Sequence, residues 1–332
     1  MKKVNKHDKF EEIDIYGLDD FSIGHEEDKE AITGCSVVIC DNRDNLVAGS
    51  DVRGGAPGTR NLDIYKPMNG FPACHAVVLS GGSLFGLNAA GGAEKYLEEK
   101  GIGEPFVVVN LPVVSQAIIF DLAIGSTDVR PDEDMAYRAC ENAYKKIKYT
   151  DGNVGVGIGA TIGKLCTPDM MMKSGLGTCC YKKGDLYVGA IMGVNAVGNV
   201  VDPGTSETIA GMMGEDGKFI DAEQFVLDNL STEDFDSGNT TIGVVVTNAK
   251  LTNPQVHKIA AWSHDGIARA IRPVHTMSDG DTMFTMATGE VEASMNLVGT
   301  MAVKAVEQAI VNAASSAESL GGYKSRKEFL EL

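Results

Sequence analysis

The chain has 332 residues, of which 43% are hydrophobic and 23% charged, a composition typical of a globular protein with a substantial core. Its formal net charge of −17 argues against nucleic acid as a partner, because phosphate recognition requires a basic face. No apolar run approaches the roughly 18–20 residues that cross a bilayer, and the N-terminal residues lack the apolar segment of a signal peptide.

The cysteines indicate the redox environment. There are seven, an odd number, and none forms a CxxC pair, so we expect reduced thiols and a cytoplasmic protein. Cys179 and Cys180 are adjacent, but they lie in a run that is more typical of a buried strand than of a redox pair.

Apolar runs and periodicity predict the secondary structure. Short apolar runs with turn-rich flanks predict strands at residues 35–40, 46–52, 76–79, 106–109, 186–201, 242–247 and 283–287. Helical periodicity predicts helices at 83–99, 254–271 and 296–319, with Ser83 as the N-cap of the first. Groups of strands followed by long helices predict one layered α/β domain.

An acidic segment precedes the strand at 242–247. Residues 203–238 carry nine acidic side chains and a single base, Lys218, so we expect a poorly packed surface connection. It ends at the bond between Asn239 and Thr240. A chain can be cut at such a place without losing its core.

Thr240 follows the polar turn at 236–239 and stands at the mouth of an apolar strand. Cleavage before it would create an N-terminal threonine, whose hydroxyl can be activated by its own α-amine. That amine has a reference pKa of about 7.7–8.0, so part of it is an unprotonated base near neutral pH. The alternative is that Thr240 simply begins a core strand.

Two familiar motifs are present only in part. Residues 152–164 satisfy GxGxxG/A, but no clear strand precedes them and no long helix follows, which disfavours nucleotide binding. A glycine-lined wall that a substrate can approach closely is the better interpretation. Ser83 lies where a hydrolase nucleophile would, but Phe85 replaces the second glycine of GxSxG.

No metal or organic cofactor is expected. The six histidines show neither an HExxH pattern nor a close Cys/His grouping. His257 and His264 lie seven residues apart on one predicted helix, and we interpret them as solvated or core-edge side chains.

Three polar residues suggest catalytic roles. Asp279 and Asp281 share one tight turn, and their mutual repulsion favours a retained proton on one of them. An ordinary acidic turn is the alternative unless the pair faces Thr240. Asn195 interrupts an apolar strand, and burying an asparagine without a partner costs roughly 1–3 kcal/mol. Donating its amide to a developing oxyanion is one function that such a residue serves.

Several ordered motifs resemble one known family. The sequence from Ser237 to Ala249 resembles the cleavage site of the L-aminopeptidase/D-esterase family, which includes β-aminopeptidases and nylon-oligomer hydrolases. Further segments match the pattern of that family, so that the similarity runs from about residue 33 to 311. They lie at residues 53–60, 75–83, 173–178 and 264–273.

The resemblance implies an αββα sandwich like that of N-terminal-nucleophile hydrolases, with different strand connectivity. It also implies self-cleavage between Asn239 and Thr240 into residues 1–239 and 240–332, which stay associated. Family members need no metal or organic cofactor and are commonly homo-oligomers, often tetramers of cleaved protomers.

The resemblance also assigns residue roles. It implies that Thr240 is the nucleophile, that Asn195 binds the oxyanion and that Asp279 and Asp281 form the carboxylate pair beside the nucleophile. Lys164 matches a lysine near that site.

Lys173 is the alternative to Lys164, and both it and Phe120 are predicted to lie at the substrate. Phe120 departs from the family pattern, because it replaces a tyrosine that some relatives place near the nucleophile. Any substrate contact or proton relay that depends on that hydroxyl is therefore in doubt.

The predicted function is a self-processing amide hydrolase or aminopeptidase that acts on a small peptide or amide through an acyl-enzyme. One alternative is a threonine-nucleophile acyltransferase that acts on an amino acid. Another is a non-enzymatic binding protein built on the uncut fold.

Overall fold

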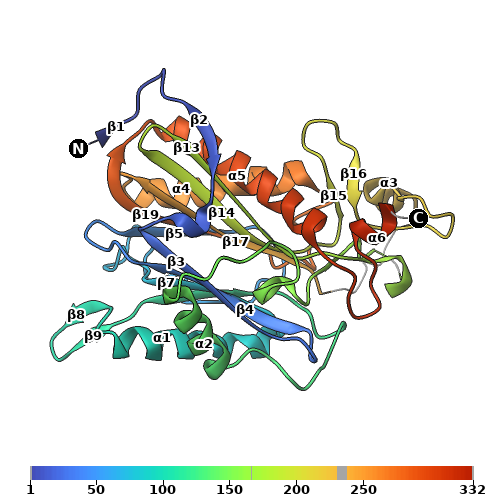
Figure 1. Ribbon diagram of the computed structural model, residues 1–332, viewed down its shortest axis with the longest axis horizontal. Coiled ribbons are helices and arrows are strands. Elements are labelled where there is room, and N and C mark those ends of the chain that lie inside the picture. Colours follow the sequence, from blue (N-terminus) through green and yellow to red (C-terminus); the bar gives the residue numbers. More distant parts are fainter. Residues whose placement is uncertain (1, 166, 230–237, 331–332) are drawn as a thin grey trace.

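Two β-sheets lie face to face, and helices cover the outer face of each (Figure 1). The computed structural model describes residues 2–165, 167–229 and 238–330. The seven-stranded sheet has the order β1-β19-β17-β14-β13-β2, with β5 also paired to β19. The five-stranded sheet has the order β3-β4-β7-β10-β6.

The strands of the two sheets and the helices are defined by their first and last residues. The larger sheet contains β1 (Lys2–Lys3), β2 (Phe10–Ile13), β5 (Val47–Val52), β13 (Leu176–Lys183), β14 (Leu186–Asn195), β17 (Thr240–Ala249) and β19 (Thr282–Glu292). The smaller sheet contains β3 (Phe21–Asp28), β4 (Thr33–Cys40), β6 (Thr59–Arg60), β7 (Ala76–Ser80) and β10 (Val114–Ile118). The α-helices are α1 (Ala89–Glu99), α2 (Glu133–Tyr144), α3 (Ala222–Asn229), α4 (Asn253–Ala270), α5 (Met295–Ser316) and α6 (Arg326–Leu330).

Shorter elements connect these layers. The short strands are β8 (Glu104–Phe106), β9 (Val109–Leu111), β11 (Thr161–Ile162), β12 (Met172–Lys173), β15 (Asn199–Val201), β16 (Thr208–Ala210) and β18 (Ile271–Arg272). The 3-10 helices are η1 (Ile15–Gly17), η2 (Ser83–Asn88), η3 (Gly155–Gly157) and η4 (Pro168–Met170).

The alternation of side chains along each strand builds the layers. On β17, Val244 and Val246 pack between the two sheets, whereas Val245 packs toward α4 and α5. On β7, Val77 and Leu79 face the same inter-sheet core, and the other face of the strand packs on α1 and α2. Each fully buried Val or Leu side chain contributes roughly 1.5–3 kcal/mol.

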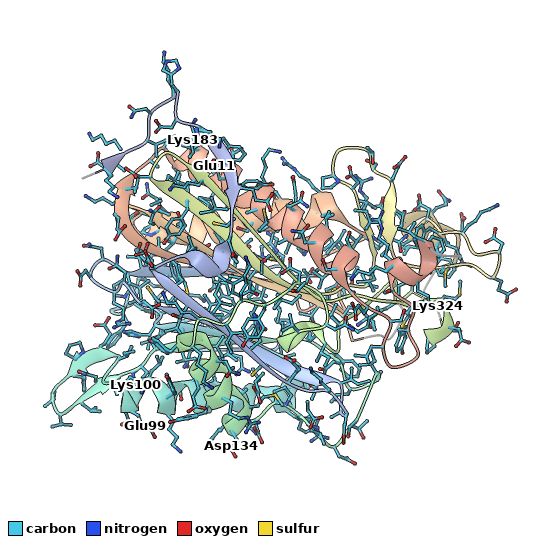
Figure 2. All side chains as sticks on the ribbon, in the orientation of Figure 1. Glu11, Glu99, Lys100, Asp134, Lys183 and Lys324 are labelled. Atoms are coloured by element: carbon cyan, nitrogen blue, oxygen red, sulfur yellow. The ribbon has the colours of Figure 1, made fainter. Side chains whose placement is uncertain are left out.

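The four layers confirm the predicted αββα architecture. Charged side chains such as Glu99, Lys100 and Asp134 on the outer helices α1 and α2 are exposed (Figure 2). Among the described residues, the helices are too short or too polar to span a bilayer.

One helix was missed and two local predictions were wrong. Helix α2 was not predicted, because its buried face consists largely of small residues such as Ala136 and Ala139. Residues 106–109 form the tip of the β8–β9 hairpin, where Val107 is exposed, and not one buried strand. Ser83 has a φ of 52° and begins η2, whose N-cap is Gly82, so it does not cap α1.

The acidic segment at 203–238 is partly structured. It contains β16 and α3, and Ala210, Met212 and Ala222 are buried, so the prediction of a poorly packed connection was wrong for this part. Small apolar residues spaced between the acids supply that packing. Residues 230–237, including the first half of the polar turn at 236–239, lie outside the described residues.

Candidate active site

Strand directions bring the predicted site residues together. Thr240 is the first residue of β17, and β14 runs antiparallel beside it, so that Asn195 at the end of β14 is its Cα partner. On the other side β19 runs parallel, so the loop before it, with Asp279 and Asp281, reaches the same end of the sheet. Segments distant in sequence therefore meet around Thr240.

The loop before β19 forms hydrogen bonds to the backbone on both sides of the Asn239–Thr240 bond. Asp281 accepts a hydrogen bond from the N–H of Thr241 at 2.6 Å. The N–H of Gly280 donates to the carbonyl oxygen of Asn239 at 3.0 Å. The Thr240 hydroxyl donates to the same carbonyl oxygen. The carbonyl of this peptide bond therefore accepts one amide donor and the hydroxyl next to it.

Gly280 permits this close approach because it has no side chain. A Cβ at this position would lie 2.8 Å from the Thr240 hydroxyl oxygen and 3.0 Å from the carbonyl oxygen of Ala56. Real Cβ atoms essentially never come within 3.0 Å of another heavy atom, so a larger residue here would have to displace the turn or the Thr240 side chain.

Asn195 is fully buried and hydrogen-bonded on both sides of its amide. Its oxygen accepts from the Thr161 N–H at 3.0 Å and from the Lys164 ammonium at 2.5 Å. Its nitrogen donates to the Phe120 carbonyl at 2.9 Å, which uses one of its two N–H groups. These bonds fix the amide beside Thr240 without the energetic cost of an unpaired buried polar group.

Lys164 links Asn195 to the segment before Thr240. Besides the Asn195 oxygen, its ammonium contacts the Gly238 carbonyl at 3.1 Å. Burial lowers the pKa of Lys164 to about 7, although the nearby Asp279 and Asp121 carboxylates oppose this change. Lys164 therefore changes charge near neutral pH.

Burial, followed by repulsion from the Asp281 carboxylate, raises the pKa of Asp279 to about 6. Hydrogen bonds from the N–H and hydroxyl of Thr276, at 2.8 and 2.6 Å, oppose this rise. The expected retention of a proton on one member of the pair therefore falls on Asp279. An acid and a base that titrate in adjoining pH ranges suit proton transfer near neutrality.

Phe120 lies beside the segment that precedes Thr240. A Cβ added to Gly238 would overlap the Phe120 ring, so the two are in close contact. Both residues line a cavity of about 670 Å³, together with Lys164, Met277, Ser278 and Tyr323. The cavity has a largely apolar wall, which suits a small organic substrate. Gly238 brings it close to Thr240, although Thr240 itself is not among the described residues that line it.

Lys173 is placed differently from Lys164. It is fully buried, and its ammonium donates to the carbonyls of Gly157 and Ala160, each at 3.0 Å, and to that of Ser174 at 2.5 Å. The described residues that line the cavity include Lys164 but not Lys173. Its bonds hold the glycine-rich loop, whose Gly159 and Thr161 do line the cavity, so Lys173 supports the wall instead of presenting a charge to the cavity.

Some residues of the site were not singled out from the sequence. His275 contacts Asp281, with 2.7 Å between Nδ1 and Oδ2. Asp121 lines the cavity while it accepts from the Gly82 N–H at 2.7 Å and the Thr33 hydroxyl at 2.6 Å. The signal for His275 was its place in a polar run just before a paired-acid turn and a buried strand.

The two histidines of α4 bind neighbouring backbone. His257 contacts the carbonyls of Ser50 and Tyr65, and His264 contacts the carbonyl of Asp51 at 3.1 Å. Within the described ranges, no group of three or more His, Cys, Asp or Glu side chains has an arrangement that could hold a metal ion.

Sequence comparisons relate the chain to known peptidases. The model of peptidase family S58 matches residues 13–328. An uncharacterized aminopeptidase of Mycobacterium leprae (strain TN) is 35% identical over 341 residues, covering 93% of this chain and 91% of that protein. A 6-aminohexanoate-oligomer endohydrolase of Paenarthrobacter ureafaciens is 29% identical over 279 residues, covering 82% of this chain and 74% of that protein.

Solved structures share the fold. The L-aminopeptidase D-Ala-esterase/amidase of Ochrobactrum anthropi, described as a variant of the Ntn hydrolase fold, matches with a TM-score of 0.68 at 18% identity. That match covers 92% of this chain and 86% of the other. A β-aminopeptidase of Burkholderia sp. matches with a TM-score of 0.64 at 17% identity, covering 100% and 94% of the two chains.

Proposed function

The chain belongs to peptidase family S58 and is a hydrolase of peptide or amide bonds, and on this premise we propose that it activates itself by cutting its Asn239–Thr240 bond. The observation that supports the cut is the Asn239 carbonyl, which accepts from the Gly280 N–H and from the Thr240 hydroxyl. Self-cleavage would divide the protein into residues 1–239 and 240–332.

In the precursor, the Thr240 oxygen attacks the carbonyl carbon of Asn239. The Gly280 N–H stabilises the charge that develops on the carbonyl oxygen. The C–N bond breaks, the proton of the hydroxyl passes to the leaving nitrogen, and an ester remains. Water hydrolyses that ester, which releases the Asn239 carboxylate and leaves Thr240 with a free hydroxyl and a free amine.

In the mature enzyme, the Thr240 amine acts as the base for its own hydroxyl, which attacks a substrate amide. The second N–H of the Asn195 amide and the Gly280 N–H are the donors for the oxyanion. Asp279 and Asp281 offset the charge of the protonated amine, and Lys164 holds Asn195 in place. The amine product leaves with a proton, and water hydrolyses the acyl-enzyme.

The cavity favours a small amide with an apolar acyl group. Phe120, Met277 and Tyr323 supply apolar wall, and the ammonium of Lys164 is already engaged by protein oxygens. Amino-acid amides and 6-aminohexanoate oligomers, the latter suggested by the name of a relative, are the substrates to test first.

Replacing Thr240 by alanine tests the proposal directly. Wild-type protein is expected to show two pieces by intact-mass measurement, and N-terminal sequencing of the smaller piece should begin at Thr240. T240A should remain a single chain without activity on amino-acid p-nitroanilides or oligoamides, because it lacks the attacking oxygen. T241A is the matched control and should still be cut, since the hydroxyl that it removes is not the proposed nucleophile.

An uncut wild-type chain with full amidase activity would remove the mechanism. So would a cleaved and active T240A protein. Either result would leave the family assignment intact and move the reactive group elsewhere.

A further inference from the structure

His275 contacts the Asp281 carboxylate, close to the proposed nucleophile Thr240, through both its ring and its backbone. Its Nδ1 lies 2.7 Å from Oδ2 of Asp281, and its backbone N–H donates to the same oxygen at 3.2 Å. The other oxygen of Asp281 accepts from the N–H of Thr241 at 2.6 Å. A single buried carboxylate therefore joins His275 to the residue that follows Thr240.

The backbone of His275 is held in an uncommon conformation. Its φ of 58° lies in the left-handed region, which non-glycine residues seldom adopt. Such a conformation persists only where the surroundings enforce it, and here the Asp281 carboxylate holds both the backbone N–H and the ring. The arrangement is the kind of local strain that accompanies functional sites.

The other neighbours of the His275 ring do not compete with Asp281 for its hydrogen bond. The His264 ring of α4 packs against it edge-on, with ring centroids 4.9 Å apart. Burial lowers the pKa of His264 to about 4, so this neighbour is neutral near pH 7. Within the described part of the chain, Nε2 of His275 is buried and has no hydrogen-bond partner. Asp281 is therefore the group that the imidazole orders.

We propose that His275 is a positioning residue for the Thr240 nucleophile, because its imidazole holds Asp281 and Asp281 holds the amide next to Thr240. This inference rests on the proposed role of Thr240. Displacing a reacting group by about 1 Å can cost roughly 100-fold in rate, so this support affects turnover. Asp281 is not among the described residues that line the cavity, so substrate affinity should change little.

Two substitutions at position 275 separate the hydrogen bond from the backbone conformation. Asparagine and aspartate are close in shape, and both tolerate the left-handed region better than most residues. Only H275N can donate an N–H to Asp281, whereas H275D places a second carboxylate there. H257N is the matched control, since His257 is another half-buried histidine with backbone partners but belongs to a different contact.

The measurements are the rate of self-cleavage and, for the cleaved fraction, kcat and KM. We expect H275D to lose at least about 10- to 100-fold in cleavage rate and in kcat, because it removes a hydrogen bond to a charged group and adds a like charge beside Asp281, with KM within about twofold. H275N should recover most of both rates, and H257N should match wild type. Added imidazole should partly restore H275G, in which glycine accepts the backbone conformation without strain.

Equal rates for H275N and H275D would overturn the inference, and so would wild-type kcat in H275G. A loss that appears in KM alone would also contradict it. These outcomes concern His275 only, because wild-type cleavage at Thr240 is recorded in the same experiment. An uncut but active wild-type chain would instead contradict the proposed function itself.

Discussion

Gly238 shows how one missing side chain bears on self-cleavage. Its Cα lies against the Phe120 ring, and a Cβ would overlap that ring. We expect G238A to slow the cut by about 5- to 150-fold, because overpacking typically costs about 1–3 kcal/mol and would displace the scissile bond. The double variant G238A/F120G should recover rate, since it removes both the ring and the Phe120 Cβ, which would lie 2.7 Å from the added Cβ. A time course of intact mass measures both.

G70A is the control for that experiment, because a Cβ at Gly70 would meet no atom within 4 Å. It should be cut as wild type is. Unchanged cleavage of G238A would show that the contact between Gly238 and Phe120 does not constrain the reaction.

Asp279 makes the stability of the uncut protein depend on pH. Its pKa is raised to about 6 when folded, against about 3.9 for an ordinary aspartate, so the native chain binds more protons between these values. Stability should therefore fall as the pH rises through this window. In the T240A background, D279N should be more stable by about 3 kcal/mol at pH 7.5 and nearly unchanged at pH 4.

Urea unfolding of the two proteins at both pH values checks this sign. D281N in the same background is a useful comparison with D279N. It also relieves the repulsion between the two carboxylates, but it disturbs the hydrogen bond from the Thr241 N–H. A stability gain from D279N at pH 4 that equals the gain at pH 7.5 would contradict the argument.

At the scale of elements, hydrophobic patterns located the central strands and long helices well. The strand predicted at 242–247 is part of β17, and the helices predicted at 254–271 and 296–319 are α4 and α5 with small shifts. The polar site residues were visible because each breaks its local pattern: Asn195 interrupts an apolar strand, and two acids share one turn. Helix α2 was missed because alanine gives a weak apolar signal.

Pairing between strands lay beyond local reasoning. Nothing in the sequence near Asn195 specifies that it lies opposite Thr240, because strand order and register depend on contacts between distant segments. The choice between Lys164 and Lys173 could not be settled from the sequence for the same reason. Both lie in apolar surroundings, and only the folded chain shows that one contacts Asn195 and the other a ring of carbonyls. The sequence placed His275 just before the paired-acid turn, but only the folded chain shows its contact with Asp281.

For the whole molecule, the position of β17 predicts that the two pieces stay together after the cut. This strand would begin the smaller piece, yet it is hydrogen-bonded to β14 of the larger piece and to β19. The inter-sheet core also mixes residues from both pieces, such as Val77 and Val244. The pieces should therefore elute together in size-exclusion chromatography under native conditions and separate only in denaturant.

Denaturing electrophoresis of the same fractions provides the check, since it resolves the pieces that native elution keeps together. Separate native elution of the pieces would show that the shared sheet does not hold them. The uncut T240A protein is the reference for the elution volume of an intact protomer.

Thr240 is 3% exposed, and its neighbours come from three strands that meet only in the finished sheet. On the proposed mechanism, a newly synthesised or misfolded chain is thus latent, since no reactive amine exists until assembly is complete. The cell needs no separate activating protease under this scheme, and only correctly folded chains become active.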